Sequence, residues 1–432
     1  MFEIIYHNNY VKGETYMLDT LKISDPVLFQ IVDEEFDRQR TGIEMIASES
    51  YVPTEILELQ GSILTNKTTE GFPGRRYHAG CHVIDKMENL GIDRAKQLYG
   101  AGHANIQAHS GSQANQTVYA AILEPGDTVL GLRLDQGGHL THGNKVNFSG
   151  KIYNFIAYGL KRETELIDYD EIEKLAKEHN PKLIVTGGSA YPRTIDYKKI
   201  SEIAKHAKAY FMVDMAHVAG LVAAKLYPNP MEYADFVTST TTKTLCGARG
   251  GFILCKEEYA KAIDKAMFPG SQGSPHLHTM AAKAYTFKRG GTEEFANLMK
   301  QVVKNAQKLG RLLSEYGFRI VSGGTDSHLL LVDLRPKKLT GSQLEAALDY
   351  VGITVNKNMI PFDPEKPMVT SGVRIGTTAM TIKGMKEEDM EQIGLIINRV
   401  ADNINNKDIL DDIKKQALEI SKKFPLYEGY FQ

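Results

Sequence analysis

Short apolar runs alternate with stretches of helical periodicity through the middle of the chain, and this alternation limits the fold more than any other feature. Apolar, strand-like runs occupy residues 128–134, 182–186 and 210–213. Between them, residues 170–179 and 197–208 place apolar side chains at helical spacing. Alternating strands and helices are typical of an α/β domain with a mostly parallel sheet. The sequence therefore predicts such a domain in this part of the chain.

The pattern changes after about Gly290. Residues 295–316 form one long helical pattern, and strand-like runs follow at 319–321, 328–334 and 353–355. Two further helical stretches close the chain, so we expect a smaller α+β domain that is attached through the long helix. The predicted division is an N-terminal arm over residues 1–54, a large domain over 55–292 and a small C-terminal domain over 293–432.

Charge and cysteine content exclude several classes of protein. The 432 residues carry a formal net charge of −2, which argues against a mainly electrostatic nucleic-acid binder. Three cysteines exclude a disulfide scaffold and suit a reducing compartment. No apolar run approaches the roughly 18 residues of a membrane helix, and residues 1–20 lack the pattern of a signal peptide. We expect a cytoplasmic protein with no nucleic-acid partner and no membrane partner.

The first unusual loop is the segment from Ser110 to Asn115, which includes Gly111 and Ser112 and opens a helical stretch. Small residues let the backbone approach an anion, and a helix N-terminus offers free N–H groups and the positive end of the helix dipole. The same residues would serve equally well as a plain helix cap. Both interpretations remain open from these residues alone.

Two further loops carry chemically active side chains. Asp214 directly follows the apolar run 210–213, so we expect it at the carboxyl end of a strand, where ligands of open α/β sheets bind. A cationic partner would keep this carboxylate ionised. Alternatively, the Asp214 side chain would simply cap the next turn. Lys243 is the lone lysine in the hydroxyl-rich run 238–244. In a dry site such a lysine can form a Schiff base, whereas in a solvated loop it would have no such role.

Together, the three loops supply the parts that a pyridoxal phosphate site requires. The loop at Ser110 would hold the phosphate, Asp214 would pair with the pyridine nitrogen, and Lys243 would hold the aldehyde. No Walker loop or G-x-G-x-x-G fingerprint competes with this interpretation. Two histidine pairs, 139/142 and 276/278, lack both the HExxH form and a set of cysteine partners, so we expect no metal site.

Several longer segments resemble one enzyme family. They are IASE (46–49), EGFPGRRY (70–77), HSGSQAN (109–115), GGHLTHG (137–143), VDMAHVAGLVA (213–223), RGG (249–251) and TSGVRIGT (370–377). In these segments the chain resembles serine hydroxymethyltransferase, from about Asp25 to about Asp402. The resemblance implies a fold-type I pyridoxal-phosphate-dependent transferase, with a large, mostly parallel domain and a smaller C-terminal α+β domain. It also implies interconversion of serine and glycine with tetrahydrofolate and 5,10-methylenetetrahydrofolate.

The resemblance assigns roles around the cofactor. Lys243 would hold the cofactor, His139 would stack on its ring, and His217 and Ser189 would contact the side of the ring hydroxyl. The implied catalytic residues are Lys243, Glu70, His139, Asp214 and His217. The implied cofactor-binding residues are Ser110, Gly111, Ser112, His139, Ser189, Asp214, His217, Lys243 and Gly273.

The resemblance also assigns the substrate residues. Arg374 and Ser48 would take the amino-acid carboxylate, and Glu70 would be the acid or base near the substrate hydroxyl. The implied amino-acid and folate residues are Ser48, Glu49, Glu70, Tyr77, His78, Leu134, Gly138, Leu140, Asn358 and Arg374. Because Glu70 and Gly273 would reach in from a second subunit, the resemblance implies a homodimer or a dimer of dimers with shared sites.

The sequence departs from the family pattern near the expected site. The departures are Ser50, Thr68, His78, Thr242 and Ala248, where the family usually has Asn, Tyr, Tyr, His and Pro. His78 replaces a phenol with a pKa of about 10 by an imidazole that titrates near 6.5. Two explanations of these changes remain open. One is tolerated sequence drift, and the other is an altered substrate specificity.

Three alternatives to an ordinary family member therefore stay open. One is a transferase for an α-substituted serine, since Thr242 and His78 would leave room for a bulkier substrate. Another is an aldolase or transaldolase for other β-hydroxy amino acids. The third is a catalytically poor relative that binds cofactor or RNA, although the presence of Lys243, Asp214 and Arg374 argues against it.

Overall fold

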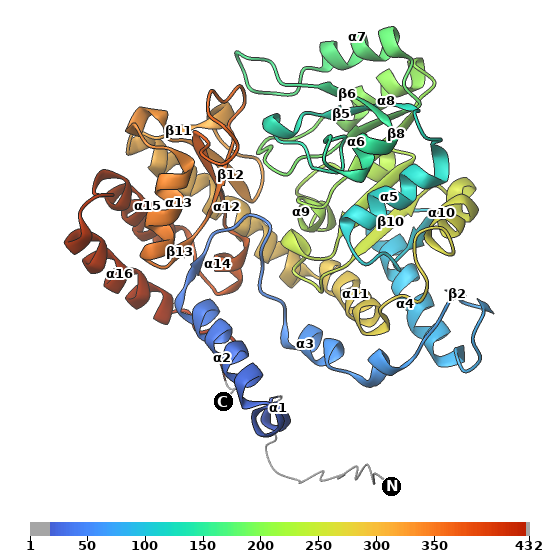
Figure 1. The fold of residues 1–432 in the computed structure, drawn as a ribbon, viewed down its shortest axis with the longest axis horizontal. Coiled ribbons are helices and arrows are strands. Elements are labelled where there is room, and N and C mark those ends of the chain that lie inside the picture. Colours follow the sequence, from blue (N-terminus) through green and yellow to red (C-terminus); the bar gives the residue numbers. More distant parts are fainter. Residues whose placement is uncertain (1–17, 429–432) are drawn as a thin grey trace.

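The described part of the chain, residues 18–428 of a computed structural model, carries two larger β-sheets on opposite sides of the molecule (Figure 1). The seven-stranded sheet lies mainly among the green and yellow elements, and the four-stranded sheet lies among the orange and red ones. The expectation that residues 1–20 form no signal peptide falls mostly on residues 1–17, which lie outside the described range.

The seven-stranded sheet is mostly parallel, as the sequence predicts. Its strands lie in the order β4-β10-β9-β8-β7-β5-β6. All neighbours from β9 to β6 pair in parallel, and β10 is antiparallel to both β9 and β4. The strands are β4 (His103–Asn105), β5 (Thr128–Leu132), β6 (Asn154–Tyr158), β7 (Leu183–Thr186), β8 (Tyr210–Asp214), β9 (Phe236–Thr240) and β10 (Gly251–Cys255).

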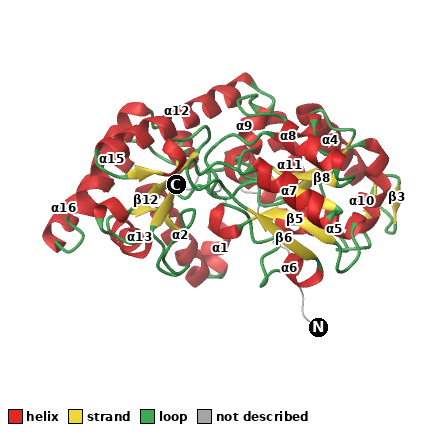
Figure 2. Cartoon of the chain, turned by 90° about the horizontal axis from the view of Figure 1, so that it is seen from above, coloured by secondary structure: helices red, strands yellow, loops and turns green. Residues whose placement is uncertain are grey.

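Helices cover both faces of this sheet (Figure 2). Leu183 and Val185 of β7 belong to the core on the side of α5 and α10, whereas Ile184 belongs to the core on the opposite face. Burial on both faces explains why these strands appear in the sequence as continuous apolar runs. The helices of this part are α4 (His82–Tyr99), α5 (Gly111–Ile122), α6 (Phe148–Ile152), α7 (Tyr169–His179), α8 (Tyr197–His206), α9 (Ala219–Ala223), α10 (Ala260–Met267) and α11 (Leu277–Gly290).

The elements predicted from periodicity agree with the structure to within about two residues at most ends. The stretches 170–179 and 197–208 are helices α7 and α8, and the runs 128–134, 182–186 and 210–213 are strands β5, β7 and β8. The side chains of Asp168 and Asp196 cap the two helices by accepting hydrogen bonds from backbone N–H groups of their first turns.

The four-stranded sheet is antiparallel throughout, with the order β11-β12-β15-β14. It packs with helices of the C-terminal part into a second core, which matches the predicted smaller α+β domain. Its strands are β11 (Arg319–Ile320), β12 (Leu329–Asp333), β14 (Asn356–Asn358) and β15 (Gly372–Gly376). The helices are α13 (Gly341–Tyr350), α14 (Thr378–Ile382), α15 (Glu387–Asp402) and α16 (Lys407–Lys422).

Two segments cross the predicted domain boundaries. Strand β1 (Ile43–Glu44) pairs in parallel with β13 (Ile353–Thr354), so part of the expected N-terminal arm belongs to the second core. Helix α12 (Glu293–Glu315) contributes Met299 to the first core and Leu309 to the second. The division at residues 54 and 292 stays a prediction, and the long helix packs against both parts.

The N-terminal helices leave apolar side chains in solvent. Helix α2 (Pro26–Thr41) has no buried residue, and α1 (Asp19–Ser24) and α3 (Thr54–Gln60) flank it in sequence. Ile23 is 85% exposed and Val27 is 70% exposed. Within residues 18–428, no helix combines the length and the apolar character needed to cross a membrane.

Candidate active site

A cavity of about 550 Å³ lies where the parallel strands of the large sheet end. The loops after β5, β7, β8 and β9 line it, together with the N-terminus of α5. Residues of the small sheet close its other side. The predicted site residues that line it are Ser48, Glu49, Ser110, Gly111, Ser112, Leu134, Gly138, His139, Leu140, Ser189, Asp214, His217, Lys243, Asn358 and Arg374.

The N-terminus of α5 lies in the cavity wall and is a candidate anion site. Ser110 is its N-cap and accepts a hydrogen bond at Oγ from the Gln113 N–H at 3.1 Å, so the cap interpretation is confirmed. The amides of Gly111 and Ser112 begin the helix and have no acceptor within it. A Cβ at position 111 would lie 2.7 Å from Cγ2 of Thr240, so only glycine lets the backbone pack this closely. Free amides at a helix N-terminus suit a phosphate.

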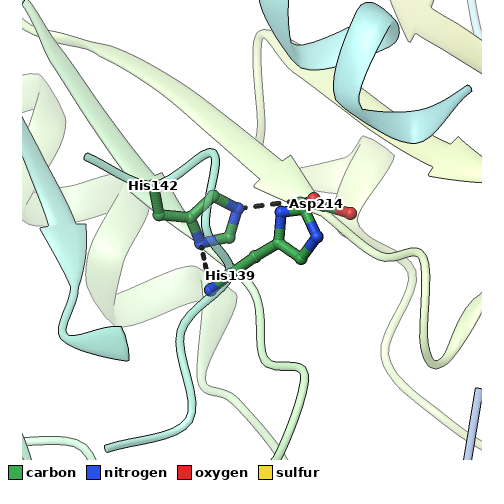
Figure 3. A group of neighbouring side chains, drawn as sticks. All are labelled: His139, His142 and Asp214. Atoms are coloured by element: carbon green, nitrogen blue, oxygen red, sulfur yellow. Dashed lines mark hydrogen bonds and ion pairs between the residues drawn. The ribbon is translucent and has the colours of Figure 1, made fainter. Parts of the chain in front are cut away.

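Asp214 ends strand β8 and is held by two donors. His142 donates from Nε2 to its Oδ2 at 3.3 Å, and Asn115 donates from Nδ2 to the same oxygen at 2.9 Å. Figure 3 shows His142 beside the carboxylate and His139 close by. Burial alone would raise the pKa of Asp214, but the hydrogen bond from His142, the nearby imidazoles and Asn115 together hold it well below its usual range. Asp214 is therefore an anion facing the cavity.

The two histidines are used in hydrogen bonds rather than left as free ligands. His139, His142 and Asp214 offer atoms within 4.8 Å of one another, a spacing that a metal ion would accept. However, Nδ1 of His142 accepts from the His139 N–H at 3.4 Å while its Nε2 faces Asp214. Nδ1 of His139 contacts Oγ1 of Thr141 at 2.7 Å. This pattern orients the carboxylate, and the lack of a metal site stays a prediction.

His139 presents a neutral ring to the cavity. Its Nδ1 also accepts a hydrogen bond from the backbone N–H of Thr141 at 3.2 Å. Burial lowers the pKa of His139 to about 4, although the charge of Asp214 acts in the opposite direction. An uncharged imidazole of this kind can lie against an aromatic ring without a desolvation penalty for charge.

Lys243 lines the same cavity, just beyond the end of β9. Its backbone has a φ of 45°, in the left-handed region that a non-glycine residue seldom adopts. Burial lowers the pKa of the Lys243 amine, and the positive charges of Arg374 and Arg249 act in the same direction. An amine that gives up its proton more readily is a better nucleophile toward an aldehyde.

Arg374 is a cation without a carboxylate partner within residues 18–428. It lies on β15, and its Nε donates to Oδ1 of Asn356 at 3.1 Å. One terminal nitrogen donates to the carbonyl oxygen of Ser189 at 2.6 Å. Burial lowers the pKa of Arg374 to about 10, a value at which the guanidinium still carries its charge at neutral pH. The fork is therefore positioned to take a carboxylate from the cavity.

Four predicted site residues lie outside the cavity of their own chain. They are Glu70, Tyr77, His78 and Gly273, and we call them the hairpin group because β2 (Gly71–Phe72) and β3 (Arg75–Arg76) lie among them. A Cβ at Gly273 would be 3.1 Å from Oε1 of Glu70, and the Glu70 N–H donates to Nδ1 of His78 at 3.4 Å. The group is thus assembled, but away from Lys243.

The departures from the family pattern are spread over different surroundings. Thr242 lines the cavity and donates from Oγ1 to Oγ1 of Thr240 at 3.0 Å. Ala248 is buried with Ile56 in a small apolar cluster. Of the five departures, Thr242 is therefore the one in direct contact with the cavity of this chain.

Sequence reasoning missed residues that act through other side chains. Asn115 belongs to the loop 110–115, but the sequence gives no sign that its amide reaches Asp214, 99 residues away. The spacing of His142 from His139 suggests at most a metal ligand and gives no sign of its contact with Asp214. Arg249 and His109 also line the cavity, and the sequence alone predicts no role for either side chain.

The residues of the cavity fit pyridoxal phosphate. A helix N-terminus with free amides, a neutral imidazole, an ionised carboxylate and an amine of lowered pKa all face one space. Its volume of about 550 Å³ is typical of small-molecule sites. Arg374 would add a place for the carboxylate of an amino acid.

A comparison with protein-family models finds a match over most of the chain. The family model described as Serine hydroxymethyltransferase matches residues 21–397. The matched range includes the candidate anion site, Asp214, Lys243 and Arg374.

Proposed function

Because the chain belongs to the serine hydroxymethyltransferase family, we propose that it transfers the hydroxymethyl group of L-serine to tetrahydrofolate, giving glycine and 5,10-methylenetetrahydrofolate. The family consists of pyridoxal-phosphate-dependent transferases of serine, glycine and one-carbon metabolism, so the chain is an enzyme of this type. The choice of serine and of folate is our proposal.

The single observation that carries the proposal is that Lys243 and Arg374 line the same cavity. The amine has a lowered pKa, and the guanidinium has no carboxylate partner in the described chain. An α-amino acid carries an amine and a carboxylate on one carbon, so it matches these two groups. Ser48 lies in the same cavity and would add a hydroxyl to the carboxylate site.

Pyridoxal phosphate, when bound, supplies an aldehyde that condenses with amines and a ring that withdraws electrons from bonds at the amino acid's α-carbon. Lys243 would hold the aldehyde, and Asp214 would keep a proton on the pyridine nitrogen. The amides of Gly111 and Ser112 would bind the phosphate. Arg374 would fix the carboxylate and thereby orient the bond that breaks.

The folate co-substrate would lie at the mouth of the cavity. Leu134 and Leu140, which are 43% and 44% exposed, provide apolar surface there. Glu49, Gly138 and Asn358 line the same space and would contact the polar edge of the pterin. Tyr77 is 76% exposed and would join this pocket from outside the cavity of its own chain.

We further propose a homodimer in which the hairpin group of each subunit completes the cavity of the other. Glu70, as the acid or base, and Gly273, at the phosphate, would then act in the partner's site. The exposed apolar side chains of α1 and α2, such as Ile23 and Val27, support an interface that buries them. The three cysteines are unpaired, which supports a cytoplasmic location for the enzyme.

A specialised activity is the second candidate, and Thr242 favours it. A threonine in the cavity wall in place of the family's histidine leaves more room, which would suit an α-substituted serine or another β-hydroxy amino acid. The aldolase or transaldolase alternative would differ from the main proposal in not requiring folate.

Turnover of the purified, cofactor-loaded protein tests the proposal. L-Serine and α-methyl-L-serine are each supplied with and without tetrahydrofolate, and amino-acid products are quantified. Folate-dependent glycine formation supports the main proposal. Faster turnover of α-methylserine, or folate-independent cleavage, supports the specialised candidate, and Thr242→His should then shift the preference back toward serine.

A further inference from the structure

A second histidine, His328, contacts the ring of His217 behind the cavity. His217 follows strand β8 of the large sheet, whereas His328 directly precedes strand β12 of the small sheet. Their rings are nearly parallel, with centroids 5.5 Å apart and an interplanar angle of 24°. Nδ1 of His217 lies 3.3 Å from Nε2 of His328. His328 is fully buried and does not line the cavity, so its side chain acts on the site through His217.

Ala47 fixes the direction of the hydrogen bond between the two rings. Nε2 of His328 lies 3.1 Å from the carbonyl oxygen of Ala47, and a carbonyl oxygen can only accept. Nε2 of His328 therefore carries the hydrogen, which it shares with Nδ1 of His217. Because that Nδ1 accepts, a neutral His217 carries its own hydrogen on Nε2.

The surroundings keep both rings neutral. Burial lowers the pKa of His328 to about 3, and it also lowers the pKa of His217 well below its usual value. The positive charges of Lys243 and Arg374 face both rings, and His139 also faces His217. Nδ1 of His328 has no hydrogen-bond partner among residues 18–428, so protonation would bury an unpaired N–H.

His328 also joins the parts of the site that hold the amino acid. Ala47 directly precedes Ser48 in the cavity wall. The carbonyl oxygen of His328 accepts from the Thr377 N–H at 3.0 Å, next to the strand that carries Arg374. Through its side chain and its backbone carbonyl, this one residue thus links the proposed carboxylate site to His217.

We propose that His328 is a positioning residue that holds His217 in the tautomer with hydrogen on Nε2, leaving a donor in the cavity for the ring-hydroxyl oxygen of pyridoxal phosphate. The opposite tautomer would turn a lone pair toward that oxygen and repel it. The identity of the acceptor rests on the proposed function, whereas the tautomer rests on the contacts of the chain itself.

The tautomer is measured directly by NMR of the full-length chain labelled with ¹⁵N-histidine, with the His217 signals assigned by their loss in His217→Gln. We expect a protonated Nε2 and an unprotonated Nδ1. His328→Leu removes the donor and should give a mixture of tautomers. His328→Gln places an amide N–H near the same position and should restore the single form. His103→Gln, a change at a histidine bonded to Asp264 instead, serves as the matched control.

A wild-type His217 with hydrogen on Nδ1, or an unchanged tautomer in His328→Leu, would overturn the proposal. If the Leu variant does not fold, His328→Asn replaces it, because the shorter amide cannot reach both Ala47 and His217.

The link to the cofactor is tested by the dissociation constant of pyridoxal phosphate. One lost hydrogen bond to an anionic oxygen predicts about a tenfold increase in His328→Leu and rescue in His328→Gln. An altered tautomer with unchanged affinity would overturn the link. A wild-type chain that does not bind pyridoxal phosphate would refute the proposed function while leaving the tautomer measurement valid.

Discussion

Asn115 donates a hydrogen bond to Oδ2 of Asp214 over 2.9 Å, and thereby connects helix α5 to the end of strand β8. The N-terminus of α5 is the proposed phosphate site, and Asp214 is the proposed partner of the pyridine nitrogen. A single side chain therefore bridges the two elements that would hold opposite ends of one cofactor.

Asn115→Ala should weaken cofactor binding. The variant removes a hydrogen bond to an ionised group, which is worth about 1.5–3 kcal/mol, so the dissociation constant of pyridoxal phosphate should rise roughly tenfold or more. Titration of the cofactor-free protein measures it. Gln116→Ala, at the exposed neighbouring position, is the control. Equal affinities in the two variants would contradict the anchoring role of Asn115.

Arg374→Ala should lower kcat/KM for the amino acid without loss of the cofactor. The variant loses a charged, two-pronged partner of the carboxylate, which corresponds to about 3 kcal/mol or roughly a hundredfold. Arg374→Lys keeps the charge but not the fork, and should recover only part of the loss. Arg311→Ala, at an exposed position of α12, is the control. Unchanged kinetics of Arg374→Ala would remove Arg374 from the substrate site.

Acid should destabilise the fold through its buried histidines. Burial lowers the pKa of His139 to about 4 and that of His328 to about 3, against about 6.5 in an unfolded chain. Below pH 6.5 the unfolded chain takes up protons that the folded chain does not. The free energy of unfolding therefore decreases as the pH is lowered. Each histidine contributes up to about 1.4 kcal/mol per pH unit.

Urea unfolding of the chain without cofactor, at pH 6.5 and pH 5.5, measures this slope. His328→Gln removes one titrating group and should therefore flatten the slope by up to about 1.4 kcal/mol per pH unit. Parallel slopes in the wild type and the variant would show that His328 is protonated alike in the folded and unfolded chain.

Arg76→Ala should destabilise the hairpin group. The Arg76 guanidinium pairs with Glu88 and with Asp85, and the side chains of Arg76 and Glu88 are 4% and 1% exposed. Removing one partner of a buried ion pair costs about 3–5 kcal/mol. Arg75→Ala changes the neighbouring side chain, which is 72% exposed, and should have little effect. Thermal unfolding of the two variants compares them, and similar losses would contradict a role for burial.

Two inactive variants should complement each other if the sites are shared. Lys243→Ala disables a site from within its own chain, whereas Glu70→Gln should disable the site of the partner. A mixed dimer then holds one site with both changes and one intact site. After unfolding and refolding together, the mixture should recover about a quarter of the wild-type activity. No recovery, with dimers formed, would place Glu70 in its own chain's site.

The parts of the site that lie next to strand ends could be predicted from the sequence. Asp214 follows an apolar run, Lys243 follows a hydroxyl-rich one, and Ser110 precedes a helical period, so each position is set by local pattern. Parallel strands end at one edge of a sheet, which is why the three residues face one cavity.

Residues that act through tertiary contacts could not be predicted in this way. His328 touches His217 across 111 positions of sequence, and a histidine before a strand carries no local sign of that contact. The same holds for the share of residues 43–51 in the second core, because a two-residue strand has too short a pattern to be recognised. Their surroundings are decided by packing between the two sheets.

The two halves of the molecule share helix α12 and the cavity, so a bound substrate would contact both of them. Arg374 and Asn358 come from the small sheet, whereas Asp214 and Lys243 come from the large one, and α12 is shared by both cores. An amino acid bound at both groups would favour one relative placement of the two halves of the molecule. Part of its binding free energy would then stabilise that placement, and neither half, produced alone, would retain the whole site.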